Sequence, residues 1–372
     1  MKLFQTLGAL FSLKPKQKLT AQYLLSLLIA VTLAFLVGAG IMLICGYNPI
    51  DCYAAMFTGA LGKPRAVGNT LAKTVTLMLT GLAVAIGAKA GIFNVGGEGQ
   101  LYLGAVAAAV VGARMAGQPA WLITVCALLA AMAAGGAYAW APGMLKVKLK
   151  VNEVVTTILL NSAAIYFCGY LANGPLKTAE RGIASGTDSI DAAAAFTPLI
   201  KLSNLTTGVF YAAAVALLVW YLMNRSTTGY EMKMTGANER FARYGGVNAD
   251  RLTMVGMVLS GMICGLVGLI EVFGLHKRFL TTISSEFYFD GMLVAMIMRY
   301  QPVGIILMSF FFAVLNIGGS ARELSCGVSS ELMLIVQSVI IFFMAAEGGV
   351  SKLWRERATQ RRARRAAREA RL

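Results

Sequence analysis

Apolar runs long enough to cross a bilayer recur along almost the whole chain. Of the 372 residues, 58% are hydrophobic and only 13% are charged, which lies far outside the composition of a soluble domain. A membrane-spanning helix needs about 20 mostly apolar residues, because lipid offers no water to satisfy backbone N–H and C=O groups. The sequence therefore predicts an all-α, polytopic membrane protein with about ten transmembrane helices between residues 21 and 346.

Positive charge predicts which side of the membrane each segment occupies. Lys146, Lys148 and Lys150 follow the apolar run that ends at Pro142, and cytoplasmic flanks are enriched in Lys and Arg. The chain from 352 to 371 carries nine basic and two acidic side chains, a net charge of 9 − 2 = +7. No nucleic-acid-binding module accompanies this charge, so we expect it to lie near anionic lipid. The predicted polar segments are a cytoplasmic N-terminal segment (1–20), an outer loop (172–204), a cytoplasmic loop (224–251) and a basic cytoplasmic tail (347–372).

One stretch between two apolar runs does not read as an ordinary membrane helix. Residues 91–100 have the sequence GIFNVGGEGQ. Each glycine costs about 1 kcal/mol of helix stability relative to alanine, and a carboxylate at bilayer depth costs about 2.5 to 3.5 kcal/mol. Irregular backbone is tolerated there only where it is buried in protein or lines a water-filled cavity. The stretch therefore predicts a broken helix beside a solute pathway.

A second mixed stretch, FYFDG over residues 287–291, also leads into a short apolar run. Paired interruptions in the two halves of a chain are typical of transporters and hint at an internal repeat. The polar members equally suit hydrogen bonding to unwound backbone, and the aromatic members equally suit packing. The candidates for the substrate pathway are Phe93, Asn94, Glu98, Gln100, Asn161, Tyr288, Phe289 and Asp290. Asn152 and Glu153, at the start of a span, favour a helix-capping role.

The cytoplasmic loop contains a short amphipathic helix. Ala237, Phe241 and Tyr244 fall on one face of it, and Gly245-Gly246 would terminate it. Either this apolar trio docks onto a partner, or it folds back onto the ends of the protein's own spans. The spacing alone does not separate these alternatives.

The inventory of reactive groups does not favour an enzyme. The single histidine, His276, has no Cys, Asp or Glu at ligand spacing, so we expect no metal site. Neither a nucleophile signature nor a phosphate-binding G-x-x-x-x-G-K-[ST] loop is present in the sequence. Energy for transport would therefore come from another subunit or from an ion gradient. If a proton gradient supplies it, Glu98, Glu271 or Asp290 would carry the proton.

Three motifs in order resemble the permease subunits of bacterial ABC importers, in the branch assigned to nucleosides and to ribose and other simple sugars. They are AGIFNVGGEGQ (90–100), NEVVTTILLN (152–161), and the segment from TGAN (235–238) to GGVN (245–248). The resemblance covers nearly the whole chain. The arginine-rich tail departs from the usual ending of the family.

This resemblance implies a type II importer permease with interrupted helices, in a bacterial cytoplasmic membrane with both termini cytoplasmic. It further implies a second permease subunit, identical or homologous, a cytoplasmic ATPase that holds ATP and Mg, and an extracytoplasmic solute-binding lipoprotein. No cofactor is expected on this chain. The resemblance implies nucleoside import by alternating access, although the same polar and aromatic groups fit a simple sugar. The family's coupling helix, which docks into the ATPase, corresponds here to Ala237, Asn238, Glu239, Phe241, Tyr244 and Gly245.

Overall fold

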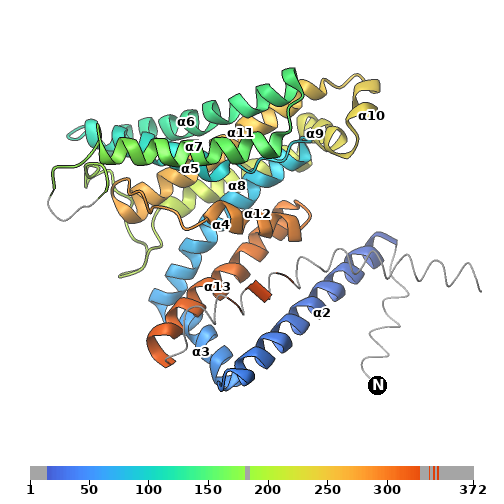
Figure 1. Ribbon diagram of the computed structural model, residues 1–372, viewed down its shortest axis with the longest axis vertical. Coiled ribbons are helices and arrows are strands. Elements are labelled where there is room, and N and C mark those ends of the chain that lie inside the picture. The colour runs from blue at the N-terminus through green and yellow to red at the C-terminus, as the bar shows by residue number, and fades with distance from the viewer. Residues whose placement is uncertain (1–14, 181–184, 327–334, 336–337, 340–341, 343–372) are drawn as a thin grey trace, which may run out of the picture. The chain divides into compact units, whose positions relative to one another are not determined.

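The computed structural model describes residues 15–180 and 185–326, together with residues 335, 338–339 and 342 (Figure 1). The chain divides into two compact units, one over 57–318 and the other over 1–56 and 319–372. The first 14 residues, the basic tail and most of the last predicted span lie outside the described residues.

The smaller unit contains a sharply bent helical pair. α2 (Pro15–Ile44) and α3 (Pro49–Leu61) are joined by a turn in which Gly46 has a φ of 83°, a left-handed conformation that glycine adopts without strain. The axes of the segments Val31–Ile44 and Pro49–Leu61 differ by 117°. The Tyr53 hydroxyl donates to the Phe35 carbonyl at 2.8 Å, which fixes the bend.

The larger unit is built from helices around α11. Its elements in chain order are α4 (Pro64–Lys89), α5 (Gly97–Arg114), α6 (Ala120–Leu149), α7 (Glu153–Asn173), α8 (Gly208–Arg225), α9 (Thr227–Ala237), α10 (Glu239–Tyr244), α11 (Ala249–Ile270), the π-helical turn η1 (Glu271–His276), α12 (Phe287–Ile297) and α13 (Pro302–Cys326), which continues past residue 318. α11 contacts α4, α5 and α6. The apolar stretches of α4 and of the α11–η1 segment are 78% and 72% buried, against 17% for α7. α4 and α11 therefore form the centre of this unit.

Small residues allow α11 to approach its neighbours at backbone distance. A Cβ added at Gly261 would overlap the Gly135 carbonyl oxygen on α6, and one added at Gly265 would overlap the Ala131 carbonyl oxygen. Helices in lipid associate through such small-residue faces because lipid supplies no hydrophobic driving force between them. The sequence spacing of the small residues in this span suits such packing, and the structure shows it at Gly261 and Gly265.

Six helices among the described residues are long and apolar enough to cross a membrane, or seven if α2 and α3 form one bent span. The described residues do not confirm the expected ten. α5 starts on a polar turn, and α12 has 11 residues, about 16 Å of helix against a hydrocarbon core of about 30 Å. The predicted internal repeat stays a prediction.

The larger unit has two ends of different construction. Figure 1 shows α9 and α10 at one end, beside the C-terminus of α6; we call this the α10 end. The opposite end carries the long connection over residues 174–207, and we call it the long-loop end. The described part of that loop is fastened to the chain after α11: the Ile190 N–H donates to the Lys277 carbonyl at 2.8 Å, and the Phe196 N–H donates to the Phe273 carbonyl at 2.9 Å.

Candidate functional site

The break between α4 and α5 is closed around Asn94. Its side-chain amide donates to Gln100 Oε1 at 2.9 Å and to Ser260 Oγ at 3.0 Å, and its Oδ1 accepts from the Gly96 N–H at 3.0 Å. Asn94 and Gln100 are each 1% exposed. Side chains thus supply hydrogen bonds to a segment that lacks helical ones. We call this group, together with Glu98 and the side chains of α7 and α12 that bond to the same break, the Asn94 network.

The second polar helix start, at α12, meets the first. Glu98 Oε2 accepts from the Tyr288 backbone N–H at 2.9 Å, and the Tyr288 hydroxyl donates to the Asn94 carbonyl at 2.6 Å. A Cβ added at Gly97 would overlap the Tyr288 ring, so a larger residue cannot occupy this position without displacing a fully buried side chain. The structure therefore joins two stretches that lie 190 residues apart.

α7 supplies the third side of the network. Asn161 Oδ1 accepts from the Gly99 N–H, and Thr157 Oγ1 accepts from the Val95 N–H at 3.2 Å. Sequence reasoning missed Thr157 and Ser260. Thr157 lies in the motif that begins at Asn152, and Ser260 lies on the small-residue face of α11. Neither signal indicates a partner 62 or 166 residues away.

The structure divides the predicted pathway residues into two groups. Those in the Asn94 network are Asn94, Glu98, Gln100, Asn161 and Tyr288, all buried. The half-buried ones are Phe93, Phe289 and Asp290. The hydrogen bonds of the first group run to other protein atoms, as expected of side chains that support unwound backbone. A direct contact of either group with solute stays a prediction.

A cavity of about 110 Å³ lies at the long-loop end of the larger unit, between α4, η1 and the start of α12. The Thr76 hydroxyl donates to Glu271 Oε1 at 2.7 Å, and Glu271 is 7% exposed. The Lys73 ammonium lies 3.8 Å from the centroid of the Phe287 ring, a cation–π distance. Lys73 also lines this cavity. We call it the Glu271 cavity.

Glu271 is the first residue of the π-helical turn η1, and Lys277 stabilises the end of that turn. In such a turn the hydrogen bonds run to the fifth residue, and single π turns occur frequently at functional sites. Lys277 ends η1 with a φ of 59°, and its ammonium donates to the Phe273 and Gly274 carbonyls at 2.8 and 2.7 Å. Burial lowers the pKa of this ammonium. Lys277 thereby satisfies carbonyls near the end of the turn, a role that the sequence pattern did not indicate.

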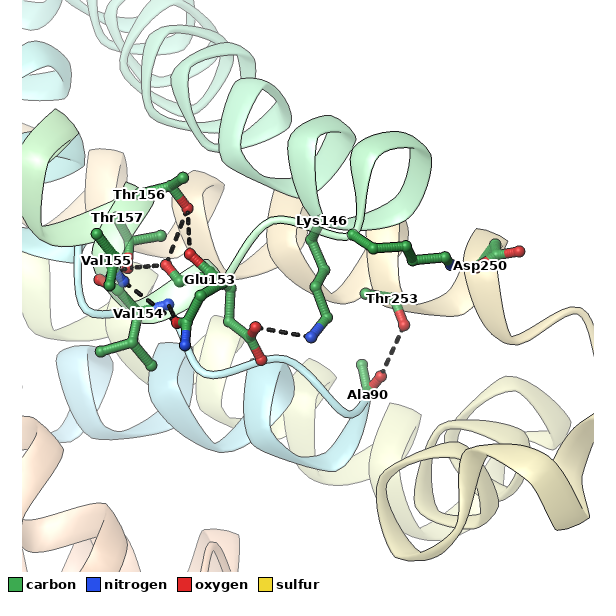
Figure 2. Close-up of polar contacts among 11 residues, drawn as sticks. Ala90, Lys146, Glu153, Val154, Val155, Thr156, Thr157, Asp250 and Thr253 are labelled. Atoms are coloured by element: carbon green, nitrogen blue, oxygen red, sulfur yellow. Dashed lines mark hydrogen bonds and ion pairs between the residues drawn. The ribbon is translucent and has the colours of Figure 1, made fainter.

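At the α10 end the start of α7 is capped as predicted. Asn152 Oδ1 accepts from the N–H groups of Val154 and Val155 at 2.9 and 3.4 Å (Figure 2). Figure 2 also shows Lys146 of α6 pointing to Glu153, with 2.7 Å between Nζ and Oε2. The capping role of Asn152 is confirmed, and the ion pair ties α6 to α7.

An ion-pair chain connects α10 to α11 and α6. Arg243 Nη2 lies 2.8 Å from Glu239 Oε1 and 2.7 Å from Asp250 Oδ1, and Lys150 Nζ lies 3.4 Å from the same Asp250 oxygen. The hydrogen bonds to Asp250 and Glu239 raise the pKa of the Arg243 guanidinium. These pairs are solvent-exposed, and exposed ion pairs contribute little to stability because water and salt screen them, so they mainly orient α10.

The predicted coupling residues lie on two helices rather than one. Asn238 is extended (φ −160°) and its side chain caps α10 by accepting from the Phe241 N–H at 3.1 Å, which separates α9 from α10. Phe241 is 64% and Tyr244 94% exposed, so the protein's own spans do not cover them. Ala237, Asn238, Glu239 and Gly245 are also exposed, and Ala242 is the buried residue of α10. The helix ends before Gly245, as predicted.

Comparison with known proteins identifies the architecture that these features belong to. A family model described as branched-chain amino acid transport system / permease component matches residues 66–345. The chain belongs to this permease family. The matched range covers the Asn94 network, the Glu271 cavity and α10.

Three relatives resemble this permease along most of its length. It is 34% identical over 328 residues to the guanosine ABC transporter permease protein NupP of Bacillus subtilis (strain 168), covering 87% of this chain and 93% of NupP. It is 31% identical to the nucleoside ABC transporter permease protein NupB of Lactococcus lactis subsp. cremoris (strain MG1363), covering 86% and 90% of the two chains. It is also 31% identical to the glucose ABC transporter permease protein TsgB13 of Haloferax volcanii, covering 85% of each chain. The chain is accordingly a multi-pass membrane protein of a transport permease family.

Proposed function

We propose that this permease is the membrane subunit of an ATP-driven importer that carries a nucleoside across a bacterial cytoplasmic membrane. The observation that carries the proposal is its likeness, over more than four-fifths of its length, to permease proteins named for guanosine and for nucleosides. A simple sugar such as glucose or ribose is the second candidate, because a relative of similar identity is named for glucose. Hydroxyl groups are common to both solute classes.

The α10 end supplies the means of coupling. A large aromatic side chain that is exposed at the tip of a short helix is typical of a protein–protein anchor, and Phe241 and Tyr244 are both of this kind. A subunit that binds them moves α10, and Arg243 transmits that movement to Asp250 at the start of α11. α11 in turn carries Ser260 of the Asn94 network. We assign the coupling role to Ala237, Asn238, Glu239, Phe241, Tyr244 and Gly245.

The Asn94 network forms a wall of the solute pathway in this proposal. It holds the α4–α5 break and the start of α12 together through Glu98 and Tyr288, so these segments move as one body during alternating access. Phe93, Phe289 and Asp290 are half-buried and lie next to this body in sequence. The proposed pathway therefore combines rigid supporting residues with a smaller number of residues that meet the solute.

The partners follow from the same assignment. They are a cytoplasmic ATPase that binds ATP and Mg, an extracytoplasmic solute-binding lipoprotein, a second permease subunit and the surrounding lipid. The cluster of Lys146, Lys148 and Lys150 supports a cytoplasmic location for the α10 end and an outer location for the long loop. Both termini are cytoplasmic in this proposal. We expect no cofactor on this chain, and we propose the type II fold with its interrupted helices as the architecture in which these parts operate.

The competing mechanism is a proton-coupled secondary transporter. Buried carboxylates at membrane depth are the usual proton carriers of such proteins, and Glu98, Glu271 and Asp290 are the candidates. This mechanism predicts uptake that stops when the proton gradient is collapsed at constant ATP. A proton-coupled mechanism assigns no function to Phe241 and Tyr244, the exposed aromatic residues of α10.

Co-purification from membranes followed by ATPase assay in lipid tests the importer. The variant Phe241→Asp removes the anchor, and Leu202→Asp is the matched control because it makes the same kind of change at an 81% exposed apolar residue of the long loop. We expect an ATPase subunit to accompany the native chain and the control. Loss of an anchor worth about 2 kcal/mol weakens binding about thirty-fold, so the Phe241 variant is expected to lose the subunit.

Two outcomes would overturn the proposal. One is a native preparation without ATPase whose uptake depends on the proton gradient. The other is recovery of the ATPase with the Phe241 variant at the level of the control, which would remove α10 from the coupling role even if the importer is real.

A further inference from the structure

The Glu271 cavity has the composition of a site for a neutral polar molecule. Among the described residues that line it, the charged ones are Lys73 and Glu271, one of each sign. The other polar lining residues are Asn69, Thr76, Asn204 and Thr206. A phosphate group gains from one cation but meets a carboxylate across the same space, whereas an uncharged solute meets hydrogen-bond donors and acceptors without net repulsion.

The size of the cavity limits what it holds. Apolar cavities of about 150 Å³ accept a molecule of benzene, and this cavity measures about 110 Å³. The cavity therefore admits one edge of a sugar or base ring, with the remainder of the molecule outside. Asn204 and Thr206 of the long loop contribute to its lining, so the cavity lies at the long-loop end.

Glu271 retains acceptor capacity in this space. A carboxylate offers about four lone-pair positions, and in the described part of the chain the hydrogen bond formed by this one comes from Thr76 to Oε1. Its Oε2 lies 4.0 Å from His276 Nε2, beyond hydrogen-bond distance. A carboxylate that is 7% exposed and only partly hydrogen-bonded is costly unless a ligand completes its hydrogen bonds.

We propose that the Glu271 cavity binds the edge of one ring of a neutral transported solute, and that Glu271 accepts hydrogen bonds from two adjacent donors on that edge. The shared chemistry is a pair of neighbouring O–H or N–H groups, as in the vicinal hydroxyls of a ribose or glucose ring, or in the N1–H and 2-amino edge of guanine. Thr76 donates to one carboxylate oxygen, and Glu271 lines the cavity from the π-helical turn η1. This inference rests on the proposed import function and names the residue that selects the solute.

The test uses the complete importer in proteoliposomes loaded with ATP, and it compares Glu271→Gln with the native chain. Guanosine, 2′-deoxyguanosine and inosine are the probes, because each analogue lacks one half of one donor pair. We expect native uptake to favour guanosine about ten-fold over one analogue, and the variant to reduce that ratio to about one. The analogue whose ratio collapses identifies the sugar or the base as the bound ring. Asp188→Asn, an exposed carboxylate of the long loop, is the control and keeps both ratios.

A direct binding measurement separates this inference from the import function. Asn69→Cys, in a chain whose native cysteines are replaced, places a single thiol in the cavity. The rate at which a membrane-impermeant maleimide labels this thiol is measured in the assembled complex. Protection by guanosine or glucose that Glu271→Gln abolishes supports the site even if no nucleoside is transported. Labelling that neither solute slows, or uptake ratios that Glu271→Gln leaves unchanged while guanosine is transported, would overturn the inference.

Discussion

The larger unit contains two polar regions between its central helices, and they differ in how far the protein itself satisfies the hydrogen bonds of their polar groups. In the Asn94 network the polar groups bond to one another: the Asn94 side chain alone engages Gln100, Ser260 and the Gly96 N–H. In the Glu271 cavity the carboxylate has one hydroxyl partner and faces open space. The most conspicuous sequence motif therefore marks supporting architecture, and the less conspicuous glutamate marks the place with unused binding capacity.

This difference predicts where mutations act. A change in the Asn94 network leaves buried polar atoms without partners or forces backbones apart, so it lowers the free energy of unfolding. A changed side chain in the Glu271 cavity has open space into which it can move, so we expect it to alter the selection of solute and to affect the free energy of unfolding little. Four substitutions, measured by chemical denaturation in detergent, sharpen the comparison in order of decreasing effect.

The largest loss is expected for Asn94→Leu. The leucine cannot bond to Gln100, Ser260 or the Gly96 N–H, and each buried polar group left without a partner costs about 1 to 3 kcal/mol. We expect the free energy of unfolding to fall by about 3 kcal/mol or more. Asn173→Leu removes one exposed hydrogen bond, to the Gly169 carbonyl, and is expected to change it by about 0.5 kcal/mol or less. Equal effects of the two changes would contradict a structural role for Asn94.

Gly97→Ala comes second. Its added Cβ would overlap the fully buried Tyr288 ring, and overpacking of this kind costs about 1 to 3 kcal/mol. Gly169→Ala on α7 is the control, because nothing lies within 4 Å of its added Cβ. The control is expected to be neutral or to stabilise by about 0.5 to 1 kcal/mol. A Gly97 variant as stable as this control would mean that α5 and α12 do not meet at Tyr288.

Ser260→Ala is expected to cost about 1 kcal/mol. The change removes one of the two acceptors of the Asn94 amide, which keeps its bond to Gln100 at 2.9 Å. Ser189→Ala, at an exposed position of the long loop, serves as the reference. Because Ser260 and Asn94 share a bond, combining Ser260→Ala with Asn94→Leu is expected to cost less than the sum of the two. Strict additivity would argue against the contact.

The smallest effect on stability is expected for Glu271→Gln, about 0.5 kcal/mol or less. The glutamine carbonyl oxygen can still accept from Thr76, and the side chain at 271 lines a cavity that can accommodate an amide group. A loss comparable to that of Asn94→Leu would place Glu271 among the supporting residues and remove the contrast between the two regions.

The sequence predicted the positions of most helices, because apolar run length decides where a membrane helix lies. The run from Thr70 to Ala88 falls inside α4, and the cap at Asn152 follows from local side-chain chemistry. The break between α9 and α10 was missed because Asn238 suits a helix surface as well as a cap. The number of spans stays a prediction, because α5 starts on a polar turn, α12 is short, and most of the last predicted span lies outside the described residues.

For the candidate site, local patterns predicted which residues are unusual but not which residues they meet. Nothing in the spacing of Thr76 and Glu271 indicates a hydrogen bond between residues 195 positions apart. The same holds for Lys73 and Phe287, whose contact depends on how α4 and α12 pack. The π turn at Glu271 adds a change of helical register that apolar periodicity does not encode.

Lys277 gives the long loop a mechanical connection to the Glu271 cavity. Its carbonyl accepts from the Ile190 N–H, while its ammonium donates to the Phe273 and Gly274 carbonyls of η1 and lies 3.4 Å from the Phe196 carbonyl oxygen. A displacement of residues 190–196 therefore shifts the backbone of η1, which carries Glu271. A solute-binding protein that binds this loop from outside would thus shift the Glu271 carboxylate. Release of solute by that protein would then coincide with a change in the shape of the Glu271 cavity.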